Sequence, residues 1–441
     1  MPEHDELETR LASLTEADFR RGMEVFRAKL GAAEASYLNT CVHCGLCAES
    51  CHYYRAEPEL ENIPAAKLDR IVRVFKGEFT ALGRIAPGLS GARRMDRDMA
   101  RAWVDSVFGR CSLCGRCSLS CTVGIALPKL FRAARAALGA MGLTPPDLQA
   151  TVDTALRSGN NMGVTKEDWV ETVQWIEEEL QMETGDPEAK LPLDKKGAKI
   201  VFTVSPREPR FFPLSLQASA KVFWAAKEDW TLTADTGWDL TNYGLFNCKD
   251  KEAGALTQNL VDAMGRLGCE TLVIGECGHG YGSARWEGPE WLQHEYPFRV
   301  VSILELMDDY IREGRIRVDP SKNQAPVTLH DPCNLVRHGG ICEAQRRVLR
   351  ASAANFVEMT PNREHNFCCG GGGGQLAMGR YKERRIRAGG VKAQQIRDTG
   401  AAIVATPCHN CVDQLSELNK EYKLKVQIKT VAEIVDDAIV P

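Results

Sequence analysis

Cysteines carry the chemistry that this sequence can perform, and thirteen of its seventeen cysteines fall into three motifs. Two of the motifs have the same spacing, C-x₂-C-x₂-C-x₃-C. They comprise Cys41, Cys44, Cys47 and Cys51, and then Cys111, Cys114, Cys117 and Cys121. In such a run the first three thiols, spaced three residues apart in one loop, bind three corners of a cubane cluster, and the fourth thiol ligates the other cluster.

The two runs therefore predict two cubane [4Fe–4S] clusters with exchanged fourth ligands. Cys121 should complete the cluster begun by Cys41, and Cys51 should complete the cluster begun by Cys111. A structural zinc site is the alternative interpretation. Zinc prefers two C-x-x-C pairs separated by a loop, so three thiols within one loop favour iron and sulfide.

The third motif lies in the C-terminal part of the chain and contains an adjacent pair of cysteines. Its members are Cys333, Cys368, Cys369, Cys408 and Cys411. Neighbouring side chains diverge, so a pair is unsuited to a simple metal site, whereas five thiols could converge on one inorganic cluster. A single zinc ion with one spare thiol is the alternative. The glycines at 370–374 permit positive φ angles and a close approach of the backbone to a bulky neighbour.

The spacing around Cys368-Cys369-Gly370 resembles the CCG cysteine-rich domain of heterodisulfide reductase catalytic subunits. The resemblance covers roughly residues 35–441 and includes the fused ferredoxin motifs, as in HdrD-like and DsrK-like subunits. It implies that the five cysteines hold one non-cubane [4Fe–4S] cluster and are the catalytic residues. In that family the ferredoxin clusters supply electrons to the non-cubane cluster, where a disulfide is cleaved.

The resemblance also implies a function and partners. The chain is expected to be an oxidoreductase subunit that reduces, or forms, a protein or cofactor disulfide. Its electrons would come from a membrane cytochrome or a quinone-interacting subunit, which would hold it at the inner face of the cell membrane. Two alternatives remain open: the iron–sulfur subunit of a glycolate, lactate or glycerol-3-phosphate dehydrogenase, or a pure electron conduit. The chain itself shows no flavin or nicotinamide motif.

Bulk properties fit a chain of several domains in a reducing compartment. With 441 residues, a net charge of −4 and a pI near 6.2, the sequence has no basic field for nucleic acid. No apolar run reaches the ~18 residues of a membrane span. The acidic first residues, 1–6, argue against a secretory signal and a mitochondrial presequence, so the cytoplasm is the expected location. Cysteines in such a compartment are more often metal ligands than disulfides.

The elements that position these motifs follow from hydrophobic periodicity. Apolar residues recur at helical spacing in 1–40, and helices are also expected near 65–75, 97–108 and 166–182. From about residue 198, short β-branched runs alternate with helical stretches, which is typical of α/β folds with parallel strands. Such runs occur at 199–204, 271–274, 299–302, 327–330, 402–405 and 425–429.

This α/β part repeats. The stretch that ends in Cys277 parallels the stretch that ends in Cys408, and Asp308-Asp309 parallels Asp436-Asp437 at a similar offset. Projection of the second copy onto the first leaves four of the five thiols without a counterpart. A cluster cannot be held there, so the first copy should be structural. Cys333 and Cys408 each follow a strand, which places them at the edge of an open sheet where α/β proteins bind ligands.

The predicted fold is therefore α+β and multidomain: a helical two-cluster ferredoxin domain followed by a duplicated α/β CCG domain. The expected boundaries are 1–140 for the helical lead-in and ferredoxin domain, 141–197 for a joining region, 198–322 for the degenerate first repeat and 323–441 for the complete one. Four histidines near the third motif are candidate proton donors to a leaving thiolate. They are His330, His338, His365 and His409.

Overall fold

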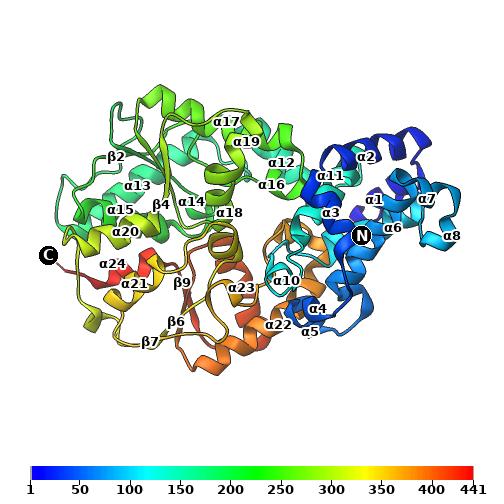
Figure 1. Cartoon of the computed structure of the whole chain (residues 1–441). Coiled ribbons are helices and arrows are strands. Elements are labelled where there is room, and N and C mark those ends of the chain that lie inside the picture. The colour runs from blue at the N-terminus through cyan, green and yellow to red at the C-terminus, as the bar shows by residue number, and fades with distance from the viewer. Residues whose placement is uncertain (1, 441) are drawn as a thin grey trace. The chain divides into compact units, whose positions relative to one another are not determined.

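The computed structural model describes residues 2–440, with side chains from Glu6 onward (Figure 1). The side chains of the acidic residues 1–5 lie outside the described part. The chain divides into two compact units, each discontinuous in sequence. The first comprises Met1–Ala150, Phe246–Lys249 and Phe367–Lys392, and the second comprises Thr151–Leu245, Asp250–Asn366 and Ala393–Pro441. The domain boundaries expected from the sequence stay a prediction.

The first unit is helical, as the periodicity predicts. Its longer helices are α1 (Pro2–Ala12), α2 (Glu16–Ala28), α3 (Ala32–Thr40), α6 (Pro64–Phe79), α9 (Arg97–Val104) and α11 (Leu127–Ala140). α2 begins at a capping box, in which the Thr15 hydroxyl accepts from the Asp18 amide and the Asp18 carboxylate accepts from the Thr15 amide. Its buried face, which includes Met23 and Phe26, packs against α11. The first forty residues are thus part of this helical core.

Short elements surround the two cysteine runs. α4 (Leu46–Ser50) contains Cys47 of the first run and α10 (Arg116–Leu119) contains Cys117 of the second, whereas α5 (His52–Ala56) begins directly after Cys51. α7 (Ala81–Ile85) and α8 (Pro87–Ser90) form a small projecting hairpin after α6. α12 (Pro146–Ser158) was not predicted from the sequence, whereas α13 (Lys166–Thr184) occupies the predicted amphipathic stretch.

The second unit contains two four-stranded parallel sheets. One has the order β2-β1-β3-β4 and the other the order β7-β6-β8-β9. The strands are β1 (Ile200–Thr203), β2 (Trp230–Thr231), β3 (Thr271–Ile274), β4 (Arg299–Ser302), β6 (Val327–Leu329), β7 (Phe356–Val357), β8 (Ile403–Ala405) and β9 (Gln427–Lys429). All six strands expected from the sequence are present, and the two-residue edge strands β2 and β7 are additions. β5 (Arg317–Val318) pairs antiparallel with β10 (Ile439–Val440).

The identical strand order confirms the duplication. Helices α15 (Pro213–Ala225) and α21 (Ala344–Ser352) follow the equivalent strands β1 and β6, and α20 (Ile303–Arg312) and α24 (Val431–Ala438) follow the equivalent strands β4 and β9. α15 packs against α24, and α20 packs against α21. An ion pair joins the two helices at equivalent positions in each of these contacts. Lys221 of α15 lies 2.5 Å from Asp436 of α24, and Arg347 of α21 lies 2.5 Å from Asp308 of α20. The two copies are therefore joined by a pseudo-twofold interface.

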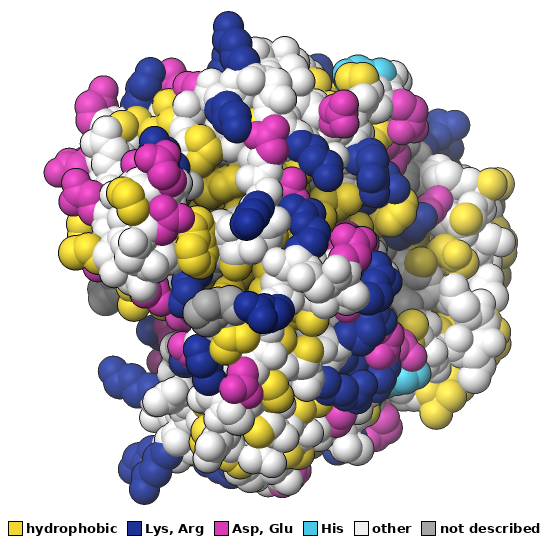
Figure 2. All heavy atoms as spheres, turned by 90° about the vertical axis from the view of Figure 1, so that its left-hand side faces the viewer, with side chains coloured by type: hydrophobic (Ala, Val, Ile, Leu, Met, Phe, Trp, Pro, Cys, Tyr) yellow, Lys and Arg dark blue, Asp and Glu magenta, His cyan; other side chains and the backbone are white. Residues whose placement is uncertain are grey.

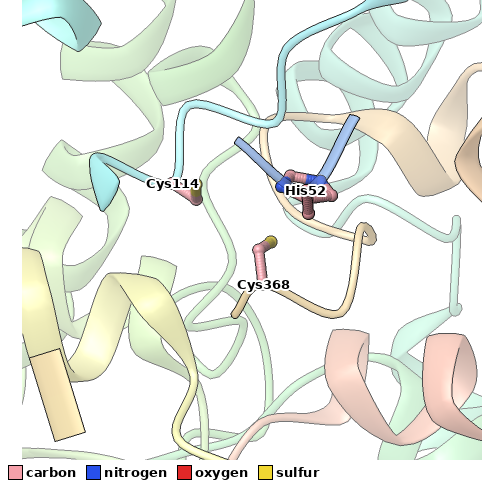
Figure 3. Close-up of side chains that lie close together, drawn as sticks. All are labelled: His52, Cys114 and Cys368. Atoms are coloured by element: carbon pink, nitrogen blue, oxygen red, sulfur yellow. The ribbon is translucent and has the colours of Figure 1, made fainter. Parts of the chain in front are cut away.

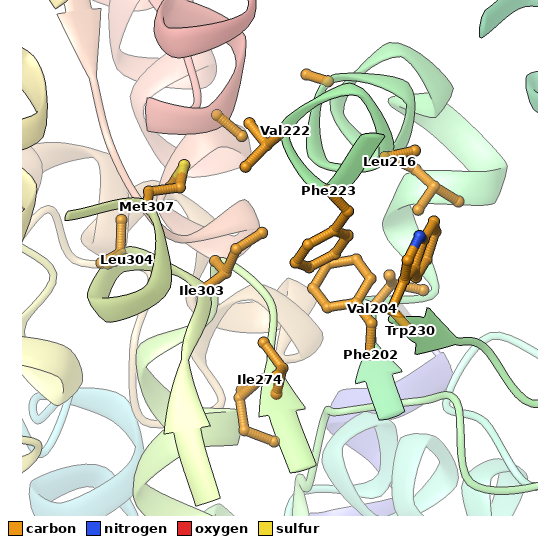
Figure 4. Packing of buried hydrophobic residues seen from close by; sticks show 14 of the residues in the cluster. Phe202, Val204, Leu216, Val222, Phe223, Trp230, Ile274, Ile303, Leu304 and Met307 are labelled. Carbon is orange, nitrogen blue, oxygen red and sulfur yellow. The ribbon is translucent and has the colours of Figure 1, made fainter. Parts of the chain in front are cut away.

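The core of this unit lies between the first sheet and the helices that face it (Figure 4). Phe202 of β1 meets Phe223 of α15 edge to face, with ring centroids 5.0 Å apart, and Trp230 of β2 lies 4.9 Å from Phe223. Ile303 and Met307 of α20 close the other side. Burial of such large side chains is the main stabilising contribution to a sheet of short strands.

One broad groove opens on the face of the second unit seen in Figure 2, where lysine and arginine side chains surround apolar ones. Its lining includes Lys195, Lys221, Trp224 and Arg315, and no cysteine or histidine is among its lining residues. It therefore offers no thiol or imidazole to an iron–sulfur cluster. Among the described residues, no helix combines the length and the hydropathy that a membrane span requires.

Candidate metal centres

The two cysteine runs of the first unit share one backbone conformation. In each run the third and fifth residues have positive φ angles, 54° at His43 and 83° at Gly45, and 53° at Leu113 and 79° at Gly115. Glycine adopts this conformation without steric cost, which explains the glycine after the second cysteine of each run. The loop carries the first two thiols and the following short helix carries the third, and all three line one cavity.

The structure brings together the cysteines in the sets that ligand exchange predicts. One apolar cavity is lined by Cys41, Cys44, Cys47 and Cys121, and a second by Cys51, Cys111, Cys114 and Cys117. Each cavity thus offers four thiols from two distant segments, with apolar walls that include Ile125 in the first and Phe131 in the second. Four soft sulfur donors in an apolar cavity fit a [4Fe–4S] cubane.

The two cavities differ in their access to solvent. Cys44 is exposed, and the apolar side chains Val42 and Val123 beside the first cavity are 65% and 40% exposed. In the second cavity, burial raises the pKa of Cys111 and Cys117 above the ordinary thiol value. Thiolates at that depth need a compensating cation, which a bound cluster supplies.

Cys368 lies against the second cavity, within the first unit. Sulfur atoms of Cys114 and Cys368 and a ring nitrogen of His52 all lie within 4.8 Å of one another (Figure 3). The Ser112 hydroxyl lies 3.5 Å from the Cys368 sulfur. A side chain of the third motif therefore touches a cysteine of the second run.

Buried polar contacts fix the segment Phe367–Lys392 in this position. Arg135 is fully buried and donates to the carbonyl oxygens of Cys111 (3.0 Å) and Gly373 (2.8 Å), which ties the second run to the glycine stretch. The Gln375 amide donates to the carbonyls of Phe108 and Cys111. The Arg116 guanidinium stacks 3.7 Å from the Phe367 ring centroid.

Gly373 shows why this stretch consists of glycines. Its φ is +65°, and a Cβ atom there would lie 2.6 Å from the carbonyl carbon of Ser112. The close approach that the sequence predicts is therefore real at Gly373, and the bulky neighbour is the backbone of the second cysteine run.

The remaining cysteines of the third motif belong to the second unit, apart from Cys369, which adjoins Cys368 in the first. Cys333 follows β6 and Cys408 follows β8, the two central strands of the second sheet. The chain crosses to opposite sides of the sheet after these strands, so both cysteines lie at its topological switch point, the usual binding position in α/β folds. Cys408 is the N-cap of α23 (His409–Tyr422), and Cys411 lies in its first turn. Convergence of all five cysteines stays a prediction.

Cys277, which the sequence identifies only as the counterpart of Cys408 in the first repeat, lies beside Cys408. It follows β3 and caps α18 (Gly278–Gly282), in the position equivalent to Cys408. Cys408 receives hydrogen bonds from the thiols of Cys277 and Cys411, and these hold the pKa of Cys408 well below the ordinary value. His279 Nδ1 lies 3.1 Å from the Cys277 sulfur. The signal was present in the repeat itself, because equivalent residues next to a twofold axis lie close together.

The four candidate histidines fall into two classes. His338 and His365 are exposed, whereas His330 and His409 are buried. His409 lies with Nε2 2.9 Å from the Ser215 hydroxyl and Nδ1 3.7 Å from the Glu208 carboxylate. Burial lowers the pKa of His409 to about 4.

Comparison with known proteins agrees with these features. Residues 37–125 match a 4Fe-4S dicluster domain, and residues 327–416 match a family described as a cysteine-rich domain. The chain is 27% identical to the Hdr-like menaquinol oxidoreductase iron-sulfur subunit 2 of Archaeoglobus fulgidus, over 92% of this chain and 80% of that protein.

Two further relatives have different names. One is a subunit of the dihydromethanophenazine:CoB–CoM heterodisulfide reductase of Methanosarcina barkeri, 25% identical over 95% of this chain and 98% of that protein. The other is the EtfAB:quinone oxidoreductase of Syntrophomonas wolfei, 24% identical over 90% of this chain and 57% of that protein. The chain therefore carries a 4Fe-4S dicluster domain and a cysteine-rich domain, and over most of its length it is similar to subunits of heterodisulfide reductase-like oxidoreductases.

Proposed function

We propose that the chain passes electrons through two cubane clusters to a non-cubane [4Fe–4S] site at which a disulfide is reduced or formed. When bound, the clusters supply one-electron transfer, and two such electrons reduce one disulfide to two thiols. The observation that carries the proposal is the contact among Cys114, Cys368 and His52, within 4.8 Å of one another. A cysteine of the second cubane set thus adjoins a cysteine of the proposed disulfide site, and electron transfer is fastest over short distances.

The order of the cavities gives the proposed path. Electrons would enter at the set that contains the exposed Cys44, cross to the buried set that contains Cys117, and leave beside Cys368. The first cavity carries an apolar surface formed by Val42 and Val123, which line it and are 65% and 40% exposed. We assign this surface to an electron-exchanging partner, a membrane cytochrome or a quinone-interacting subunit. That partner would hold the chain at the inner face of the cell membrane.

The proposed disulfide site consists of the five cysteines of the third motif. The first repeat contributes no ligand, but Cys277 donates a hydrogen bond to Cys408. The backbone amide of Cys411, in the first turn of α23, also donates to Cys408, and a helix N-terminus stabilises negatively charged sulfur. These residues orient the thiolates and stabilise their charge before a substrate arrives.

A pure electron conduit is the second candidate. It is favoured by the relative from Syntrophomonas wolfei, whose name specifies a quinone and no disulfide. In both functions electrons pass through the two cubane clusters. The functions differ only in whether the electrons then reduce a disulfide at the third motif or leave to another acceptor.

The test uses the full chain purified without oxygen. Three clusters require about twelve irons per chain. With a reduced viologen dye as donor and the CoB–CoM heterodisulfide or a disulfide-bonded peptide as acceptor, dye oxidation measures turnover. We expect Cys369→Ser to lower turnover at least 100-fold while both cubane signals remain reducible, and Cys342→Ser, outside the motifs, to retain it. Zinc in place of four irons would refute the third cluster, and twelve irons without disulfide turnover would assign the conduit.

A further inference from the structure

The hairpin formed by α7 and α8 exposes apolar side chains in an unusual way. Leu82 is 61% exposed, Ile85 84% and Leu89 89%, the last two being the highest values among the large apolar side chains described. Three such residues within eight positions form a continuous apolar tip, which we call the 82–89 tip. It projects from the end of α6, at the right-hand edge of Figure 1.

The tip is held rigidly by its own backbone. Thr80 caps α7 by accepting from the Gly83 amide at 3.1 Å, and the Arg93 amide donates to the Arg73 carbonyl at 3.0 Å. A Cβ atom on Gly83 would lie 2.0 Å from the Lys76 carbonyl oxygen, so the hairpin lies tightly against α6. The polar groups of the hairpin therefore form hydrogen bonds within the hairpin and to α6, and the apolar side chains point toward solvent.

The surroundings of the tip are cationic, although the chain as a whole carries −4. Residues 73–94 contain five basic residues and one acid, Glu78, whose carboxylate accepts from the Met95 amide. The basic residues are Arg73, Lys76, Arg84, Arg93 and Arg94. Arg93 and Arg94 are exposed, and within the described part of the chain no carboxylate lies in ion-pair distance of either.

We propose that the 82–89 tip inserts into an anionic lipid bilayer, with the flanking arginines at the headgroups. Segments that bind at a membrane interface have this arrangement: their apolar side chains insert into the bilayer, and neighbouring basic side chains bind the anionic headgroups. A bilayer accepts single apolar side chains without a complementary shape. A stable protein partner needs about 800 Å² on each side, far more than three side chains present. The contact is made by the chain itself and does not depend on the proposed redox function.

Vesicle flotation of the full chain, purified without oxygen, tests the proposal. The protein should float with vesicles that contain phosphatidylglycerol, and bind those of phosphatidylcholine alone at least tenfold more weakly. A variant with Leu82→Ser, Ile85→Ser and Leu89→Ser should lose at least tenfold in binding. A matched control with Leu156→Ser, Met182→Ser and Phe211→Ser, which replaces three exposed apolar residues elsewhere, should bind like the wild type.

A second variant gives a readout that does not depend on loss of binding. Ile85→Trp should add fluorescence that brominated lipid quenches on anionic vesicles. Arg93→Gln with Arg94→Gln should remove the preference for phosphatidylglycerol. Equal losses in the two serine variants, or no quenching at position 85, would overturn the proposal. Binding to native membranes but not to lipid vesicles would also overturn it, and would assign the tip to a membrane protein.

Discussion

The sulfur of Cys408 accepts hydrogen bonds from Cys277 and Cys411, and this local arrangement makes a prediction about redox potential. A donor to a cluster sulfur stabilises the more negative, reduced state. Cys277→Ala should therefore lower the potential of the cluster proposed at the third motif. A hydrogen bond worth about 1 kcal/mol corresponds to roughly 40 mV for one electron.

Potentiometric titration of the Cys277→Ala variant checks this expectation, with iron content unchanged. The control is Cys269→Ala, because Cys269 is also buried in the second unit but bonds to backbone groups away from the third motif, the Leu267 carbonyl at 3.8 Å and the Ala198 amide. An equal shift in both variants would mean that the effect comes from packing. Loss of four irons in the Cys277 variant would make Cys277 a ligand.

Asp239 makes stability depend on pH. Burial raises its pKa to about 7, although its carboxylate accepts from the amides of Asn161 (3.0 Å) and Thr241 (2.6 Å). The folded chain keeps this proton up to about pH 7, whereas the unfolded chain releases it near pH 4. The contribution of Asp239 to the free energy of unfolding should therefore fall as pH rises from about 4 to 7, by on the order of 4 kcal/mol, and level off above that range.

Asp239→Asn should remove this contribution, because the amide does not titrate, whereas the buried Glu208 and Glu276, whose pKa values burial raises to about 8, titrate in both chains. Melting temperatures at pH 5.5 and 8, followed by tryptophan fluorescence, measure the difference; Trp238 is stacked 4.5 Å from Trp169 and reports locally. Asp235→Asn, a change at a half-exposed carboxylate nearby, should leave the fall in place. A wild-type chain that gains stability between these pH values relative to Asp239→Asn contradicts the assignment.

Among the elements, the glycine stretch offers a matched pair of substitutions. Gly373 and Gly400 have φ angles of +65° and +64°, but a Cβ atom meets the Ser112 backbone at Gly373 and nothing within 4 Å at Gly400. Both alanine variants carry the left-handed backbone cost of about 1–2 kcal/mol. Only Gly373→Ala adds an overlap, worth roughly 1–3 kcal/mol more.

Gly373→Ala should therefore lower the melting temperature more than Gly400→Ala. Because the overlap separates the segment of Cys368 from the second cysteine run, it should also slow reoxidation of the cubanes by a disulfide. Stopped-flow absorbance measures that rate. Equal behaviour of the two variants would show that the contact with Ser112 is unimportant.

The regular helices and strands could be predicted because apolar residues recur in them at a clear helical or strand spacing. Six β-branched runs became six strands, and apolar residues at helical spacing became the buried faces of α2 and α6. The two-residue strands β2 and β7 could not be found in this way, since two residues establish no period. α12 was missed because its sequence begins with the prolines at 145–146, which indicate a helix end as readily as a helix start.

For the whole molecule, the ligand sets link distant parts of the chain. Cys51 belongs to the first run in sequence but lines the cavity of the second run, with Cys111, Cys114 and Cys117. Cys51→Ser should therefore damage the buried cubane and spare the exposed one, and Cys121→Ser should do the reverse. Electron paramagnetic resonance with iron analysis distinguishes the two clusters. Damage to the exposed cluster in Cys51→Ser would show that each run closes on itself.

The sequence predicted the ligands of each site better than it predicted the contacts between one site and the residues around it. Cysteine spacing gave the sets around Cys41 and Cys111, because the ligands of a cubane lie on one short loop. The contact between Cys114 and Cys368 joins residues far apart in the sequence and depends on the buried Arg135 and Gln375. No local pattern encodes such a contact. The repeat in the sequence makes Cys277 and Cys408 equivalent, but their proximity follows from the twofold packing of the two copies, which the structure adds.

The discontinuity of the first unit has a consequence for biosynthesis. The ribosome delivers residues 1–150 early, but the segment Phe367–Lys392 that completes this unit emerges only after most of the second unit has been made. Domains made first usually fold first. Here the hydrogen bond from Arg135 to the Gly373 carbonyl cannot form until more than half of the chain has been translated after Arg135. All four cysteines of the buried cavity, which include Cys51 and Cys117, would therefore be synthesised long before Cys368 arrives beside them.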